Sequence, residues 1–309
     1  MRSALALVAM VLTGAAAAQA QQAPSILFIG NSFTFGSGSA VRYYRANTVT
    51  DLNDEGIGGV PALFKSFADQ SGLDYDVYLE TRGGSNFDFH VDNKLDVIAN
   101  RPWDKVVAHG YSTLDADKPG DPTAFVAMGV RLAEVLHDRN PAVEIYLTAT
   151  WSRADKTYPS DGPWHGEPIE AMALDVRAGY DLLAAEAPGV KSVNPVGEAW
   201  TRAMQTGVAD PNPYDGIDPE KLDLWTYDHY HASTAGYYLE ALVIFGNVTG
   251  VDPRALGAGE CSGMELGLSG SQVGALQQVA YDQLTVKGPM TRAPAGATPP
   301  RRASRCAVR

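Results

Sequence analysis

Four large apolar residues in a row, stopped by a small polar turn, set narrow limits on the fold of this chain. Residues 26–29 read Ile-Leu-Phe-Ile, and Gly30-Asn31-Ser32 follow them directly. A short apolar run bounded by turn residues is typical of a parallel strand that is buried on both faces. Open α/β sheets bind ligands beyond the carboxyl ends of such strands. The sequence therefore places the hydroxyl of Ser32 at a binding edge.

Strand and helix signals alternate along the rest of the chain. We expect further strands over residues 75–81, 105–108, 143–149 and 190–193. We expect helices over residues 60–71, 91–100, 121–140, 168–187 and 233–248, the last of these closing the domain. Alternating strands and helices with right-handed crossovers form a layered sheet. The sequence thus predicts an α/β fold, a three-layer α/β/α sandwich around a five-stranded parallel sheet of flavodoxin-like type.

The two ends of the chain differ in composition from its middle. Residues 1–20 combine Arg2, an apolar stretch and the ending Ala18-Gln19-Ala20, which is typical of a cleaved secretory signal peptide. Residues 21–286 are long enough for one domain and contain no apolar segment long enough for stable membrane insertion. Residues 287–309 are basic and rich in proline and alanine, so we expect a disordered tail. The protein is expected to be secreted or periplasmic.

Charge and cysteine content exclude several classes of partner. The chain has a net charge of −12 although its tail carries no acidic residue, so the predicted domain is strongly acidic and should repel nucleic acid. Cys261 and Cys306 are the two cysteines, and they are expected either to form a disulfide or to remain separate thiols. No spacing typical of metal ligands occurs, and we expect no metal or organic cofactor. The sequence gives no basis for an oligomeric state.

A second motif supplies what a nucleophilic serine needs. A serine hydroxyl attacks an acyl carbon only if an imidazole takes its proton and a carboxylate orients that imidazole. The segment Asp228-His229-Tyr230-His231 offers one carboxylate and two histidines. Either His229 or His231 could be the base on spacing alone.

Together, the two motifs resemble those of the SGNH (GDSL-like) hydrolase superfamily, which opens with Gly-Asp/Asn-Ser and closes with Asp-x-x-His. The resemblance implies that Ser32 is the nucleophile, His231 the general base and acid, and Asp228 the residue that orients it. Residues 231–239 also resemble the family's His-x-Ser-x-x-Gly-x-x-Leu ending. We expect Ser233 to cap the following helix and Gly236 to allow close packing.

The oxyanion donors are less evident. The backbone N–H of Ser32 is one candidate, and the segment Arg82-Gly83-Gly84-Ser85-Asn86 resembles the family's second block, which implies Gly84 as another. The family's third block reads Gly-x-Asn, but this chain has His109-Gly110-Tyr111-Ser112-Thr113. Ser112 falls where the asparagine should lie, and Asn86 or Tyr111 are alternatives.

These inferences favour an exported serine ester hydrolase that acts on a small-molecule or carbohydrate ester, with a small acyl group such as acetyl. Two long segments, residues 35–59 and 152–167, could shape the substrate pocket, the second with aromatic residues that either bind a ligand or pack internally. One alternative is a carbohydrate- or ligand-binding protein on the same fold that has lost its chemistry, because the third-block asparagine is missing. Another is a lysophospholipase or acyltransferase.

Overall fold

A computed structural model describes residues 23–159 and 161–287 of the chain. The expected signal peptide and the expected disordered tail, except for its first residue, Lys287, lie outside the described residues, and so does Cys306. Cys261 is buried at the start of a helix and is disulfide-bonded. Within the described part of the chain, no helix is both long and apolar enough to cross a membrane.

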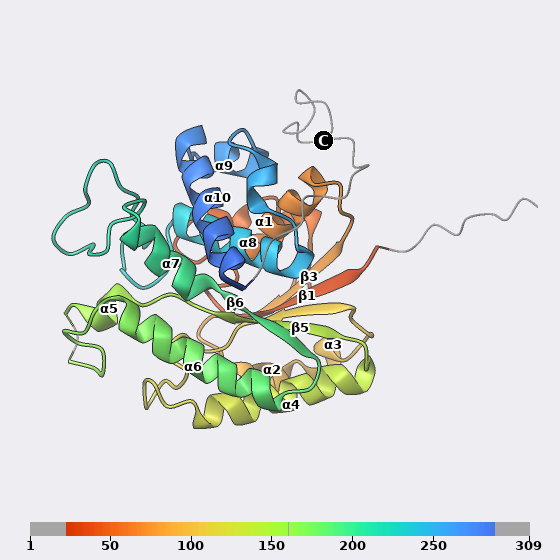
Figure 1. Cartoon of the computed structure of the whole chain (residues 1–309). Helices are drawn as coiled ribbons and strands as arrows, with labels where there is room; N and C mark the ends of the chain where they lie inside the picture. Colours follow the sequence, from red (N-terminus) through yellow and green to blue (C-terminus); the bar gives the residue numbers. More distant parts are fainter. Residues whose placement is uncertain (1–22, 160, 288–309) are drawn as a thin grey trace, which may run out of the picture.

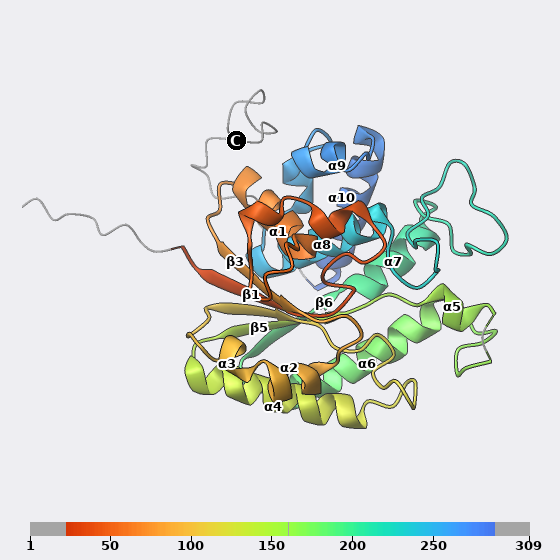
Figure 2. The same ribbon diagram turned by 180° about the vertical axis from the view of Figure 1, so that it is seen from behind.

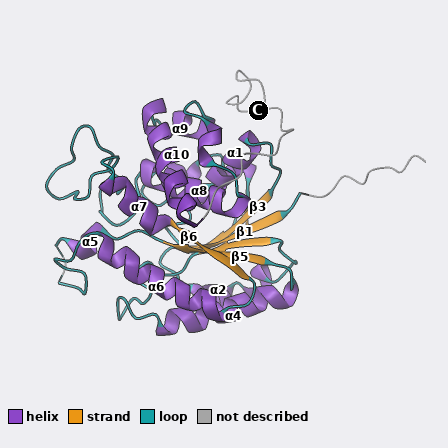
Figure 3. Ribbon diagram, in the orientation of Figure 1, coloured by secondary structure: helices purple, strands orange, loops and turns teal. Residues whose placement is uncertain are grey.

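The centre of the molecule is a single sheet in which all strand pairs are parallel (Figure 3). The strand order is β2-β3-β1-β4-β5-β6, and without β2 it is the flavodoxin-like order that the sequence predicts. The strands are β1 Ser25–Gly30, β2 Thr50–Asp51, β3 Asp76–Thr81, β4 Lys105–Ala108, β5 Glu144–Ala149 and β6 Val190–Pro195.

The prediction of five strands was wrong by one edge strand. β2 is two residues long and comes from the segment between β1 and α1, which the sequence suggested was a loop. Thr50 and Asp51 lack the apolar run that identifies a buried strand, because β2 lies at the sheet edge and pairs only with β3. Figure 2 shows that this segment, coloured orange-red, passes beside α1 and α8.

Helices cover both faces of the sheet (Figure 1). One layer consists of α1 Gly59–Gln70, α7 Val196–Gln205, α8 Thr234–Thr249, α9 Cys261–Glu265 and α10 Gly270–Leu284. The other consists of α2 Phe87–Asn93, α3 Leu95–Ile98, α4 Thr123–Arg139 and α6 Glu170–Glu186. The short α5 Ala154–Thr157 follows β5, and the 3-10 helices are η1 Ala40–Tyr43, η2 Ala46–Thr48, η3 Pro253–Leu256 and η4 Thr285–Lys287.

Several helices differ from the prediction. The expected helix over residues 91–100 is two short helices, α2 and α3, because Lys94 interrupts the helical backbone. The predicted closing helix is α8, but α9 and α10 follow it and pack against α1 and α8. α7 was missed because it begins directly after β6 with no turn residue between them. Ser233 caps α8 by accepting a hydrogen bond from the N–H of Gly236, as predicted.

Alternate residues of β1 face the two helical layers. Ile26 and Phe28 belong to the apolar cluster under α1 and α8, while Leu27 and Ile29 belong to the cluster under α4. All four side chains are fully buried. β1 is therefore fixed from both sides, and the turn that follows it starts from a rigid position at the middle of the sheet.

Candidate active site

Ser32 lies in the turn after β1, as the sequence predicts, and Asn31 anchors that turn. The side-chain nitrogen of Asn31 donates to the carbonyl oxygens of Ser85, at 2.9 Å, and Gly110, at 3.0 Å. Its side-chain oxygen accepts from the N–H of Phe33 at 3.1 Å. One buried amide thus joins the turns that follow β1, β3 and β4. Ser32 itself is 7% exposed, so its hydroxyl lies at the floor of the site rather than on the surface.

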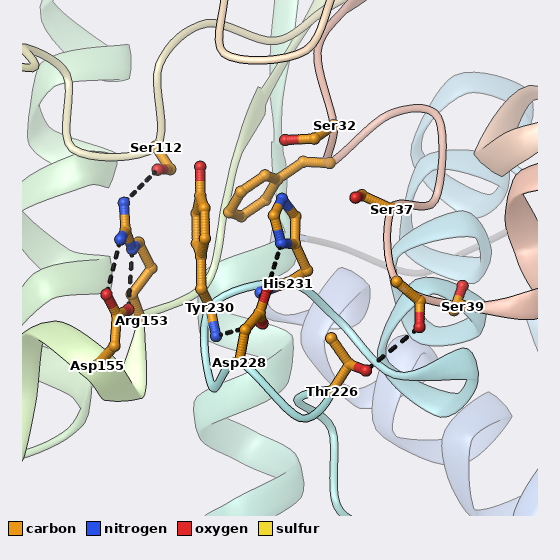
Figure 4. Close-up of polar contacts among 12 residues, drawn as sticks. Ser32, Ser37, Ser39, Ser112, Arg153, Asp155, Thr226, Asp228, Tyr230 and His231 are labelled. Carbon is orange, nitrogen blue, oxygen red and sulfur yellow. Dashed lines mark hydrogen bonds and ion pairs between the residues drawn. The ribbon is translucent and has the colours of Figure 1, made fainter.

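Asp228 and His231 lie in the loop before α8, which folds back to the same sheet edge (Figure 4). Asp228 Oδ2 accepts from His231 Nδ1 at 2.6 Å. Asp228 Oδ1 accepts from the backbone N–H groups of Tyr230, at 2.9 Å, and His231, at 2.8 Å. Since a carboxylate can only accept, the proton lies on Nδ1 and the lone pair lies on Nε2.

The Nε2 atom of His231 points toward Ser32 in Figure 4. It is buried and has no hydrogen-bond partner among the described residues, Ser32 included. Tyr237 of α8 donates its hydroxyl to the carbonyl oxygen of Ser32 at 3.2 Å, which ties the serine turn to the helix behind His231. The structure thus brings a serine hydroxyl and an oriented imidazole to one place from opposite ends of the chain.

His229 does not share this arrangement. Its backbone is left-handed, with φ of 54°, and its ring packs against Tyr214 at 4.4 Å. The imidazole that Asp228 orients is that of His231.

Burial and hydrogen bonding act in opposite directions on Asp228. Burial raises the pKa of its carboxyl group, but hydrogen bonds from the His231 ring and from the N–H groups of His231 and Tyr230 outweigh burial, and the net pKa is lowered. Asp228 is therefore ionised at neutral pH and can stabilise a positively charged His231.

Two backbone N–H groups are available near the serine. Within the described part of the chain, the N–H groups of Ser32 and Gly84 donate to no protein acceptor. Gly84 has φ of +72°, which favours glycine, and the position of an added Cβ would be open space. Gly84 is therefore accessible in a loop after β3, where the resemblance places an oxyanion donor; that role stays a prediction.

Two of the three residues considered for the third donor have side chains with other partners. Asn86 Oδ1 accepts from the N–H groups of Phe87, at the start of α2, and Tyr111, while its nitrogen donates to the carbonyl of Leu114. Ser112 is buried and its oxygen lies 3.5 Å from Nη1 of Arg153. Asn86 thus braces the loop after β4, and its part in catalysis, like that of Ser112, stays a prediction.

A cluster next to Ser112 has no signal in the sequence. The guanidinium of Arg153 lies over the ring of Tyr230 at 3.6 Å and is held by Asp155, at 2.7 Å and 3.0 Å. The hydroxyl end of Tyr230 lies between Ser112 and Ser32 in Figure 4. Tyr230 stands inside the motif that identified Asp228 and His231, but Arg153 comes from the segment after β5, and no spacing links the two residues.

A buried Ser-His-Glu chain supports the loop that carries Gly84. His90 Nδ1 is hydrogen-bonded to Glu80 at the end of β3, and His90 Nε2 lies 2.9 Å from Ser85 Oγ. The Ser85 hydroxyl also donates to the carbonyl of Arg82 at 2.8 Å. Glu80 and His90 have no exposed surface. Ser85, His90 and Glu80 contact one another as the members of a catalytic triad do, but the ring of His90 is enclosed by protein.

Aromatic residues form the wall behind His231. The ring of Phe33 lies 5.6 Å from His231 and stacks on Trp151 at 4.4 Å, and Trp151 stacks on Trp200 at 4.4 Å. Trp151 and Trp164 are buried, while the hydroxyl of Tyr158 donates to a backbone carbonyl. The aromatic residues in and before the segment 152–167 therefore serve packing, which was the second of the two expectations for them.

His109 borders the site but is enclosed. Its ring packs against Phe33 at 5.3 Å, and its Nδ1 lies 3.4 Å from the Thr34 hydroxyl. Burial lowers the pKa of His109 to about 3, with a smaller contribution from the charge of His90. His109 is neutral at any pH near 7.

A pocket of about 410 Å³ opens beside Gly84 and Tyr111. Its lining includes the carboxylates of Asp88, Asp115 and Asp117. Across residues 23–159 and 161–287, no group of three or more His, Cys, Asp or Glu side chains is arranged to hold a metal ion.

Several solved structures resemble the structure of this chain. No family model matches the sequence, and no curated protein matches it. Among solved structures, a candidate SGNH hydrolase from Slackia heliotrinireducens is 22% identical, with a TM-score of 0.50 and coverage of 74% of this chain and 100% of its own. A DUF4886 family protein from Bacteroides uniformis is 16% identical, with a TM-score of 0.58 and coverage of 88% and 98%.

A candidate GDSL-like lipase from Parabacteroides merdae is 18% identical, with a TM-score of 0.53 and coverage of 74% of this chain and 97% of its own. At such identities the likeness concerns the fold. Two of these three structural neighbours bear the name of the superfamily that the sequence motifs resemble.

Proposed function

Since the chain has the fold of the SGNH hydrolases, we propose that it is a serine ester hydrolase in which Ser32 attacks the acyl carbon. The observation that carries this proposal is the pair formed by Asp228 and His231, whose unpartnered Nε2 points toward Ser32. A buried nitrogen that accepts no hydrogen bond is costly, and a substrate-bound enzyme in which Ser32 donates to it would remove that cost.

The reaction would follow in two halves. His231 Nε2 takes the proton of Ser32 as the serine oxygen forms a bond with the acyl carbon. The resulting imidazolium gives that proton to the alcohol oxygen as the ester bond breaks, which leaves an acyl-enzyme on Ser32. In the second half, water gives a proton to His231 and its oxygen attacks the acyl carbon. The proton then returns to Ser32 as the carboxylic acid leaves.

The N–H groups of Ser32 and Gly84 would donate to the oxyanion. Each such donor is worth about 2.7–4 kcal/mol in the transition state of acyl transfer. The anchoring of the Ser32 turn by Asn31 and the support of the Gly84 loop by Ser85 and His90 favour this role, since an oxyanion hole must be fixed before the reaction.

The pocket beside Gly84 suggests what kind of alcohol the substrate carries. Three aspartates line the pocket against one cation, Arg82, and they would repel a phosphate or carboxylate on the substrate. Carboxylates accept hydrogen bonds from hydroxyl groups, and Phe89 and Tyr111 offer aromatic surface. A small acyl ester of a neutral carbohydrate fits this chemistry, and we propose that the protein acts on it outside the cytoplasm.

One observation favours a second candidate. Ser32 forms no hydrogen bond with His231, and the third-block asparagine is absent, so the same pocket could bind a carbohydrate without cleaving it. The two candidates differ in turnover.

The test is hydrolysis of p-nitrophenyl acetate, butyrate and octanoate by the protein and by Ser32→Ala. We expect turnover that falls with acyl length and is abolished in the variant. Ser37→Ala, which changes a serine in the same turn, is the matched control and should retain activity. Turnover that persists in Ser32→Ala, or no turnover in the unaltered protein, would contradict the proposal, and the second result would favour the binding protein.

A further inference from the structure

The proposed oxyanion hole has one donor fewer than the family pattern. The Ser32 and Gly84 N–H groups would provide two, and Ser112, whose oxygen lies near Arg153, stands in place of the family asparagine. An oxyanion hole with a missing donor loses about 100-fold or more in kcat. A further side chain in the right place would restore it.

The hydroxyl group of Tyr230 lies where such a donor is needed. The Tyr230 side chain comes from the loop that carries His231 and reaches toward Ser112 and Ser32 (Figure 4). In Figure 4 the Tyr230 hydroxyl lies between those two serines, on the side of Ser32 that faces Ser112. His231 lies on the side of the Tyr230 ring opposite to Arg153. The base and the phenol therefore approach Ser32 from different directions, as a general base and an oxyanion donor must.

The ring of Tyr230 is held on both faces. The Arg153 guanidinium lies over it at 3.6 Å, and the His231 ring lies 4.0 Å away. Phe33 packs against it at 5.3 Å, and the backbone N–H of Tyr230 is fixed by Asp228. A side chain with its ring fixed in this way needs little reorganisation to donate in the transition state.

We propose that the Tyr230 hydroxyl donates the third hydrogen bond to the oxyanion formed during attack by Ser32, in place of the missing asparagine. Ser112 is a positioning residue: its oxygen accepts from Arg153 and its proton points to the Tyr230 oxygen, which leaves the phenol proton for the oxyanion. Such a chain of donors strengthens its last member. This inference rests on the proposed ester hydrolase function.

The protonation of Tyr230 agrees with this role. Burial raises its pKa above the usual value of 10.0, although the charge of Arg153 lowers it. The phenol therefore keeps its proton throughout the neutral range, and it can donate.

The test compares Tyr230→Phe with the unaltered protein. The variant keeps the ring contacts with Arg153, Phe33 and His231 and removes only the hydroxyl. We expect kcat for p-nitrophenyl acetate to fall about 100-fold or more with little change in KM, and the rate constant for fluorophosphonate labelling to fall in parallel. Tyr227→Phe is the matched control, since Tyr227 is 83% exposed in the same loop, and it should keep full activity.

Ser112→Ala tests the positioning role. Alone it should lower kcat about fivefold, the effect of one neutral hydrogen bond. In the Tyr230→Phe background it should lower kcat no further, because Ser112 acts through the phenol. Additive losses would overturn the positioning role.

The outcomes separate this inference from the proposed function. If Tyr230→Phe retains more than a third of the wild-type kcat while Ser32→Ala is inactive, Tyr230 is not a donor and the esterase proposal stands. If the unaltered protein shows neither Ser32-dependent turnover nor labelling, both proposals are wrong. Circular dichroism and thermal unfolding of each variant show whether a lost activity reflects a lost fold.

Discussion

Replacing Asp228 by asparagine exchanges one carboxylate oxygen for an NH₂ group. It should move the ring proton of His231 from Nδ1 to Nε2. An asparagine at this position keeps its side-chain oxygen toward the N–H groups of Tyr230 and His231, because turning the amide over would set a donor against both of them. Its NH₂ group then faces Nδ1 of His231, which must become an acceptor. The ring proton moves to Nε2, which can no longer take the proton of Ser32.

The magnitude follows from two effects. An ion pair between His231 and a carboxylate about 4 Å away is worth about 4 kcal/mol at the dielectric of a partly exposed site, and a tenfold change in rate corresponds to about 1.4 kcal/mol. Asp228 is 29% exposed, so solvent screening keeps the attraction near this value rather than far above it. Loss of the charge alone costs about 10³-fold, and in serine proteases the wrong tautomer costs about 10⁴-fold.

The assay is p-nitrophenyl acetate hydrolysis between pH 6 and pH 10. We expect kcat of Asp228→Asn to fall by about 10³- to 10⁴-fold, with residual activity that keeps rising with pH as hydroxide replaces the base. Asp96→Asn, at an exposed position in α3, is the control and should leave kcat unchanged. A folded Asp228→Asn variant with kcat within tenfold of the wild type would refute the assignment of Asp228 and His231.

Three further predictions concern the groups around the site. Gly84→Ala should lower the free energy of unfolding by about 1–2 kcal/mol, because alanine is strained at a φ of +72°. It should also lower kcat at least about tenfold by displacing an oxyanion donor. Calorimetry and ester hydrolysis measure the two effects, and an unchanged kcat would exclude Gly84 as an oxyanion donor. Glu80→Ala should cost about 1–3 kcal/mol by leaving buried His90 without its hydrogen-bond partner, as measured by guanidinium unfolding, and a loss under about 0.5 kcal/mol would contradict this. Because the pKa of folded His109 is about 3 and its ordinary value is 6.5, the unfolded chain binds a proton in that window that the folded chain does not. Stability should therefore fall as pH falls from 6.5, by up to about 1.4 kcal/mol per pH unit from this group, and His109→Gln should show a correspondingly smaller slope in urea unfolding.

The strands and the two catalytic motifs were predictable because their signals are local. The apolar run before Gly30-Asn31-Ser32 reflects a strand buried on both faces, and its position in the sheet follows from the alternation of elements. β2 carries no such signal, because an edge strand of two residues buries little apolar surface. α10 did carry a signal: Ser269 and Gln272 form a capping box that is visible in the sequence.

The rest of the site depends on contacts between distant segments. Arg153, Ser112 and Tyr230 follow different strands or precede α8, and nothing in their spacing predicts that they meet. The Ser85 and His90 pair is close in sequence, but only the fold brings Glu80 to the other ring nitrogen. Such clusters are determined by packing, which a single sequence does not specify locally.

In the proposed mechanism, His231 activates Ser32 and no other serine. This claim is tested most directly by reaction with a fluorophosphonate, followed by intact-mass measurement and identification of the modified peptide. We expect one label per chain on Ser32, no label in Ser32→Ala, and no label on Ser85, whose histidine is enclosed. A label on Ser85, or no label on a folded protein, would contradict this mechanism.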